Sequence, residues 1–139
     1  MIEEGRVDIE VIKQFISEID IFSELPDNVM EDMAKPMRLY SFDKDEYLIV
    51  KDKSARFMYL IWDGTVSVDL GEKNISLSKG TVLGEMSLMT GERSTADVVA
   101  ETGTSAFIIN RFFFNKLVSE HTELESVMSV LVKSRKTGN

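Results

Sequence analysis

The stretch from Met37 to Asn110 consists of short runs in which apolar and polar residues alternate. Turn-forming residues separate these runs, and Asp63-Gly64 is a strong hairpin pattern. The alternation predicts antiparallel strands near residues 37–42, 46–51, 57–62, 64–70, 73–78, 81–83, 95–101 and 104–110. Many short antiparallel strands at this spacing favour a sandwich or jelly roll.

Helical patterns flank this β-rich stretch on both sides. Asp8 is a plausible N-cap for a first helix, and Pro26 suits the first turn of a second. Asn110 and Thr122 are expected to begin two more. We therefore predict a mainly β fold with flanking helices. An eight-stranded β roll (a double-stranded β-helix or jelly roll) spans 37–110, with N-terminal helices in 8–35, C-terminal helices in 111–136, and one domain over 1–139.

The last predicted helix carries an apolar stripe and a basic end. The stripe comprises Leu124, Val127, Met128, Leu131 and Val132. It is a candidate ligand lid or dimer seam, and packing against the domain's own β roll is at least as well supported. The basic cluster is interpreted as solvation of the helix end, where cations are favourable; it comprises Lys133, Arg135 and Lys136.

Composition narrows the classes of function. The net charge of −8 argues against duplex DNA or an anionic membrane as a partner, because both need a basic face. No apolar run approaches the roughly 18 residues of a membrane span, and the N-terminus lacks a signal pattern, so a cytoplasmic location is expected. The absence of cysteine excludes thiolate zinc sites and iron–sulfur clusters.

His121 is the chain's one histidine, and it lies in the C-terminal helical region. A metal-binding β roll generally takes two or three histidines from its strands, so we predict no metal site. A Ser–His–Asp arrangement is not credible with the histidine so placed. We therefore expect no catalytic residues, and a binding module in place of an enzyme.

The segment 83–96 interrupts the strands with a tight turn, one helical turn and a polar loop. Gly84 permits the turn, and amides after it can face an anion. Glu85 suits a sugar hydroxyl and Arg93 suits a phosphate, so the segment predicts a pocket for a sugar phosphate. The plainer interpretation is a β-turn capped by a buried helical turn.

The order Leu77, Lys79-Gly80, Gly84-Glu85-Met86-Ser87-Leu88, Ala96, Val98 and Ala100 resembles the phosphate-binding cassette of the cyclic nucleotide-binding domain family. That family includes bacterial catabolite activator proteins and regulatory subunits of cAMP-dependent kinase. Other stretches are similar to it as well: Ile21-Phe22-Ser23-Glu24-Leu25-Pro26, the run from Tyr59 to Val68, and the helix with Arg111, Phe114 and Leu117.

The resemblance implies a cyclic nucleotide, cAMP or cGMP, as the ligand. It implies that Glu85 accepts a bond from the ribose 2′-hydroxyl, and that amides around Gly84, Met86 and Ser87 meet the cyclic phosphate. The expected ligand-binding residues are Leu83, Gly84, Glu85, Met86, Ser87, Arg93, Ser94, Thr95 and Ala96.

The sequence departs from the family pattern at the arginine that should neutralise the phosphate. Arg93 falls where typical members have proline, and Ser94 falls where they have the arginine. Either a shorter loop delivers Arg93 to the phosphate, or Arg93 points to solvent and the pocket has lost its key cation.

Two functions follow. One is a sensor whose ligand shifts the helix after Thr122, with output through a homodimer of the C-terminal helix or a separate effector domain or protein, and no direct DNA binding by this chain. The other is a degenerate domain that binds no nucleotide and serves protein interaction.

Overall fold

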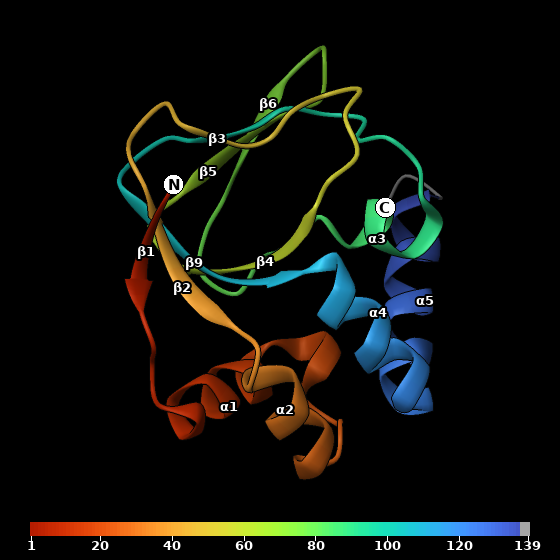
Figure 1. Ribbon diagram of the computed structural model, residues 1–139. Coiled ribbons are helices and arrows are strands. Elements are labelled where there is room, and N and C mark those ends of the chain that lie inside the picture. The colour runs from red at the N-terminus through yellow and green to blue at the C-terminus, as the bar shows by residue number, and fades with distance from the viewer. Residues whose placement is uncertain (137–139) are drawn as a thin grey trace.

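The computed structural model describes residues 1–136. Figure 1 shows a β roll with one pair of helices beneath it and a second helical layer along one side. In chain order the elements are β1 (Ile2–Gly5), α1 (Ile9–Glu18), the 3-10 helix η1 (Asp20–Phe22), α2 (Asp27–Ala34), β2 (Arg38–Phe42), β3 (Tyr47–Ile49), β4 (Phe57–Asp63), β5 (Val66–Asp69), β6 (Asn74–Leu77), β7 (Val82–Leu83), α3 (Glu85–Thr90), β8 (Val98–Ala100), β9 (Thr104–Asn110), α4 (Arg111–Glu120) and α5 (Thr122–Lys136).

The strands form two antiparallel sheets, with orders β1-β2-β9-β4-β7 and β3-β8-β5-β6. The prediction of a β roll flanked by helices is confirmed, and each of the eight predicted strands has its counterpart in β2 to β9. The structure adds β1, which the sequence did not predict. This strand pairs with the edge of β2, where Ile2 lies opposite Ser41 and Glu3 opposite Tyr40.

Strand β4 is buried on both faces, and it separates two cores. Met58 and Leu60 face the helices and join the core formed with α1, α2, α4 and α5. Tyr59 and Ile61 face the interior of the roll. Successive side chains of a β-strand point to opposite faces, so a strand that is covered on both faces places alternate residues in two different cores.

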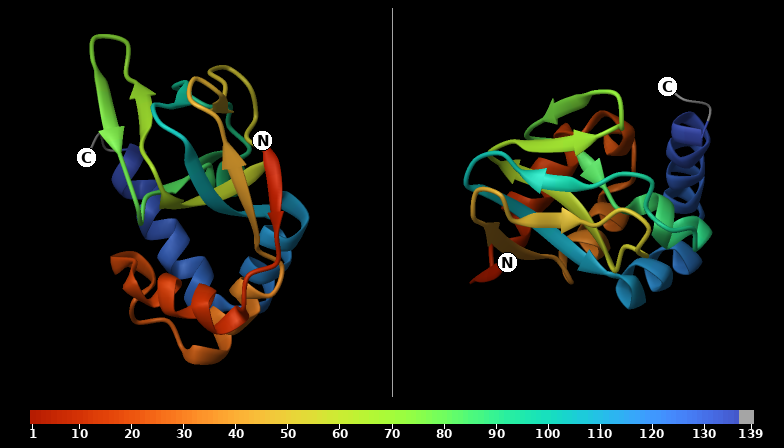
Figure 2. Two further views of the ribbon diagram at one scale, coloured as in Figure 1. Left: turned by 90° about the vertical axis from the view of Figure 1, so that its left-hand side faces the viewer. Right: turned by 90° about the horizontal axis from the view of Figure 1, so that it is seen from above.

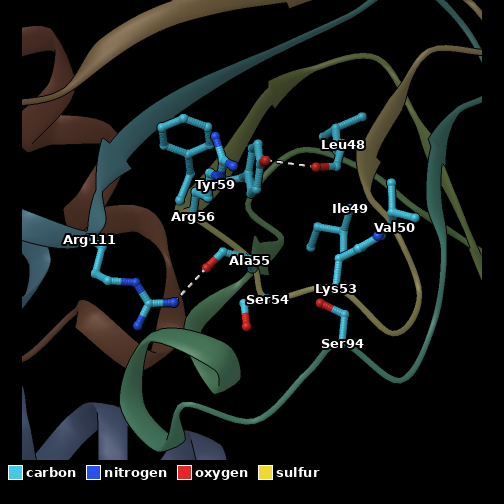
Figure 3. Close-up of a pocket in the computed structure, with 11 residues that line it drawn as sticks. Leu48, Ile49, Val50, Lys53, Ser54, Ala55, Arg56, Tyr59, Ser94 and Arg111 are labelled. Carbon is cyan, nitrogen blue, oxygen red and sulfur yellow. Dashed lines mark hydrogen bonds between the residues drawn. The ribbon is translucent and has the colours of Figure 1, made fainter.

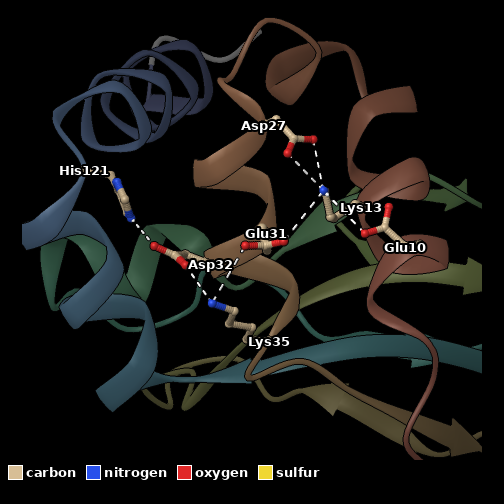
Figure 4. Close-up of polar contacts among 7 residues, drawn as sticks. All are labelled: Glu10, Lys13, Asp27, Glu31, Asp32, Lys35 and His121. Atoms are coloured by element: carbon tan, nitrogen blue, oxygen red, sulfur yellow. Dashed lines mark hydrogen bonds and ion pairs between the residues drawn. The ribbon is translucent and has the colours of Figure 1, made fainter.

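Polar contacts join the helices beneath the roll, as Figure 4 shows. The Lys13 ammonium of α1 lies 3.0 Å from a carboxylate oxygen of Asp27 at the start of α2. Nε2 of His121, at the junction of α4 and α5, lies 3.0 Å from Oδ2 of Asp32 in α2. These contacts link α2 to α1 and to the α4–α5 junction.

Helix α5 runs along the side of the roll beside α3 (Figure 2). Its apolar stripe is covered by the chain itself: Leu124 and Met128 are 2% and 0% exposed, and Val132 is buried as well. The alternative of packing against the chain's own core is therefore the one found. Leu124 and Met128 are not available as a dimer seam in this arrangement.

Within residues 1–136, the helices all fall short of the length and apolar character that crossing a membrane requires.

Candidate functional site

The candidate site begins where β7 ends and α3 starts. Gly84, between them, has φ +86°, a left-handed conformation that glycine adopts without strain. A Cβ at this position would overlap the carbonyl oxygen of Phe57 in β4. The close approach of two backbones therefore requires glycine here, and it sets the direction of α3.

Glu85, the first residue of α3, is completely buried, with 0% of its surface exposed. Nη1 of Arg135, near the end of α5, lies 2.5 Å from its Oε1. The contact is an ion pair without the alignment of a hydrogen bond, and neither carboxylate oxygen accepts a hydrogen bond from residues 1–136. A buried carboxylate with unfilled lone pairs is rare, because desolvating it is costly.

Burial raises the pKa of the Glu85 carboxyl above its ordinary value of 4.5. The positive charge of Arg135 and the backbone N–H of Glu85 itself act in the opposite direction and lower that pKa, but burial outweighs them. Burial therefore favours the protonated form of the Glu85 carboxyl more than water would.

Arg135 is fixed by a second contact, since its Nη2 donates a hydrogen bond to the carbonyl oxygen of Val82 at 2.8 Å. The sequence interpretation of Arg135 as part of a solvated helix end is therefore wrong. Arg135 follows Met128 by seven positions and Val132 by three, so it continues the buried face of α5. That periodicity was the pattern that could have found it.

A cavity of about 500 Å³ opens above α3, and we call it the α3 cavity. It gathers all nine residues that the sequence singled out as ligand-binding, together with Arg135. Its remaining wall is largely apolar, with Glu92 as the one acidic member, and comes mainly from the β5–β6 hairpin and its neighbours: Ile49, Val68, Leu70, Ile75, Leu77, Glu92 and Val98. One end is thus polar and charged, and the other is apolar.

The backbone at the start of α3 adds donors to the polar end. The first helical hydrogen bond runs from the Leu88 N–H to the carbonyl oxygen of Gly84, at 3.4 Å. The N–H groups of residues 85–87 precede it and have no helical acceptor. Ser87, whose side chain is 4% exposed, lines the cavity beside them.

Arg93 lies at the mouth of the α3 cavity, and it is exposed. Among residues 1–136 its side chain has neither an ion pair nor a hydrogen bond. The next residue, Ser94, is held by its backbone: its N–H donates to the Lys53 carbonyl and its carbonyl accepts from the Asp52 N–H, both at 2.8 Å. Arg93 thus borders the cavity and also faces solvent, and its contact with a phosphate stays a prediction.

Known proteins match both the sequence and this geometry. The family model of the cyclic nucleotide-binding domain matches residues 39–121. Human cyclic nucleotide-gated channel beta-1 is 29% identical over 86% of this chain, which spans only 10% of the channel's length.

Two solved structures have the same fold. The regulatory domain of Toxoplasma gondii PKA, crystallised with cAMP, superposes with a TM-score of 0.79 at 18% identity, over 93% of this chain and 50% of that one. The regulatory subunit of a cAMP-independent protein kinase A from Trypanosoma brucei superposes with a TM-score of 0.78 at 26% identity, over 92% and 46%. The family match covers more than half of the chain. The chain belongs to the cyclic nucleotide-binding domain family.

Proposed function

We propose that this chain is a non-enzymatic regulatory module that binds a cyclic nucleotide, cAMP or cGMP, in the α3 cavity. The observation that carries the proposal is the Glu85 carboxylate, which is fully buried yet accepts no hydrogen bond from residues 1–136. A ribose hydroxyl would supply the missing donor in a site where water is largely excluded.

The remaining parts of the ligand have matching surfaces. The cyclic phosphate would meet the N–H groups of residues 85–87, the Ser87 hydroxyl and, from the mouth, the Arg93 guanidinium. The base would lie on the apolar wall that the β5–β6 hairpin provides. Nine of the residues that line this cavity, 83–87 and 93–96, are the proposed ligand-binding set.

Binding would act on α5 through Arg135. The ribose hydroxyl and the Arg135 guanidinium would both bind the Glu85 carboxylate. The ligand would therefore compete with the Arg135–Glu85 ion pair that holds the end of α5. The helix would then shift between two arrangements, which a separate effector domain or protein would detect. We expect no direct DNA binding and no membrane contact by this chain, and the cytoplasmic location stays a prediction.

A second candidate is a degenerate domain used for protein interaction. The exposure of Arg93 favours it, since the phosphate would lack a buried cation. The Trypanosoma brucei relative, described as cAMP-independent, is consistent with this alternative, because family membership alone does not secure cAMP binding.

Calorimetric titration with cAMP, cGMP and the phosphate-free nucleosides adenosine and guanosine separates the two functions. The sensor predicts saturable heat with at least one cyclic nucleotide, and at least tenfold weaker binding in Glu85→Ala and in Arg93→Ala. Glu72→Ala and Lys73→Ala, in the exposed β5–β6 turn, are charge-matched controls that should bind normally. Silence with every cyclic nucleotide up to about 1 mM would reject the sensor, since such a site has less than about 4 kcal/mol of binding free energy.

A further inference from the structure

A second cavity, of about 640 Å³, adjoins the α3 cavity on the other side of Ser94. We call it the basic cavity. Figure 3 shows its walls, which come from the end of β3, the loop 50–56, the start of β4 and the first residue of α4. It is lined by Leu48, Ile49, Val50, Lys53, Ser54, Ala55, Arg56, Phe57, Tyr59, Ser94 and Arg111.

The charge of this lining is unusual for an acidic chain. Three lining residues are cationic, namely Lys53, Arg56 and Arg111, and none is acidic, although the whole chain carries a net charge of −8. Within residues 1–136, none of these three pairs with a carboxylate. Uncompensated cations around one concave surface raise the local concentration of anions.

Arg111 is anchored at the edge of the basic cavity. Its Nη2 donates to the carbonyl oxygen of Ala55 at 2.9 Å, as Figure 3 shows, and its backbone N–H donates to the carbonyl of Arg56 at 3.1 Å. A guanidinium has five N–H donors, so this anchor leaves several for a ligand. The anchor also fixes the planar group, which reduces the entropy lost on binding.

The loop that carries Lys53, Ser54 and Arg56 is held at three points. The reciprocal backbone bonds between Ser94 and residues 52 and 53, each 2.8 Å, join it to the α3 cavity. The Lys51 N–H donates to Oδ1 of Asp97 at 2.7 Å. The backbone of this loop is thus held in place, and the side chains of Lys53, Ser54 and Arg56 extend from it.

The floor of the basic cavity is apolar. Leu48, Ile49 and Phe57 contribute carbon surface, and the Tyr59 hydroxyl is occupied by a 2.7 Å hydrogen bond to the Leu48 carbonyl. The lining thus combines cationic and hydroxyl donors with apolar carbon surface. This distribution suits a ligand with an anionic group at one end and a flat or aliphatic part at the other.

We propose that the basic cavity binds a small phosphorylated molecule. The phosphate would be held by Lys53, Arg56 and Arg111 with the hydroxyls of Ser54 and Ser94, and the apolar part would rest on the floor. Ser94 and Ile49 line both cavities, so a ligand in the basic cavity would also affect the position of the loop that carries Arg93. The inference does not depend on nucleotide binding at Glu85.

Phenyl phosphate is the probe, followed by ¹H–¹⁵N spectra of backbone amides and arginine Nε groups. We expect saturable shifts at residues 53–56, at Ser94 and at the Arg111 Nε, weaker binding of inorganic phosphate, and no comparable shifts with phenol. The double variant Lys53→Gln/Arg56→Gln should weaken binding at least about tenfold, because it removes two charge-assisted contacts. Lys44→Gln/Lys51→Gln removes the same charge from exposed positions outside the cavity, and should leave the affinity unchanged.

Either of two results would overturn the proposal. Equal weakening in both double variants would mean that only the net charge of the surface matters. Loss of the shifts in Arg93→Gln, with normal binding in Lys53→Gln/Arg56→Gln, would place the phosphate in the α3 cavity instead. The dispersion of each variant's amide spectrum verifies that it is folded.

Discussion

The guanidinium of Arg135, near the end of α5, lies 2.5 Å from the buried carboxylate of Glu85 at the start of α3. The pair joins the C-terminal helix to the residue that the family resemblance assigns to ribose recognition. One partner is 34% exposed and the other 0%, so the contact can open toward solvent from the α5 side only. Under the proposed function, a ligand that binds Glu85 would compete with this contact and would loosen the end of α5.

Arg135→Gln should strengthen binding of the cyclic nucleotide. The wild-type chain must break the Arg135–Glu85 contact before the ribose can bind, and this lowers its apparent affinity. Removing the competing cation should lower the dissociation constant of the cyclic nucleotide about fivefold, as measured by calorimetry. Lys133→Gln makes the same charge change at an exposed position of α5 and should have no effect. Weaker binding in Arg135→Gln alone would instead make Arg135 a ligand-binding residue.

Glu85 should make stability depend on pH in an unusual direction. Its folded-state pKa is raised above 4.5, so between 4.5 and that raised pKa the folded state binds more protons than the unfolded state. The free energy of unfolding contributed by Glu85 is therefore largest below pH 4.5 and falls as pH rises through the raised pKa.

The measurement compares wild type with Glu85→Gln in urea denaturation from pH 4 to pH 8. Because the other carboxyls are common to both proteins, the difference between their unfolding free energies isolates Glu85. The wild type should lose stability relative to the variant as pH rises. A difference that stays constant over this range would contradict the raised pKa.

The β roll could be predicted because most of its strands alternate apolar and polar residues, and because β4 is a continuous apolar run that requires burial on both faces. β1 was missed for a physical reason. Ile2, Glu3 and Glu4 are exposed, so this strand is held by backbone pairing to β2 and leaves no burial pattern in its side chains.

The nine predicted site residues were easy to group, because they fall within one segment of fourteen positions, 83–96, and fold around one turn. Arg135 was not grouped with them because it reaches the site through the packing of a separate helix. The exposed position of Arg93 also could not be decided from sequence, since it depends on how the loop 91–97 is held by Ser94 against residues 52 and 53.

Gly84→Ala should destabilise the fold by about 3 kcal/mol, because it adds left-handed strain to a steric overlap with the Phe57 carbonyl. Gly91→Ala is the matched control. Gly91 also has positive φ, +75°, but a Cβ there meets no atom within 4 Å, so only the strain remains, about 1 kcal/mol. Urea denaturation of both variants measures the difference. Equal losses of unfolding free energy in the two variants would show that the overlap with the Phe57 carbonyl of β4 adds no cost beyond the backbone strain.

Met128→Ala tests how α5 is held. Met128 is 0% exposed in the core between the helices and the roll, so truncating it should cost about 2–5 kcal/mol of unfolding free energy, independent of protein concentration. Val130, on the same helix, is 67% exposed, and Val130→Ala should change stability by less than about 0.5 kcal/mol. If the apolar stripe were instead a dimer seam, the unfolding midpoints of wild type and of Met128→Ala would both rise with protein concentration, and light scattering would report a dimeric mass. A concentration-independent loss, with a monomeric mass, would establish that the stripe belongs to the chain's own core and is not a dimer seam.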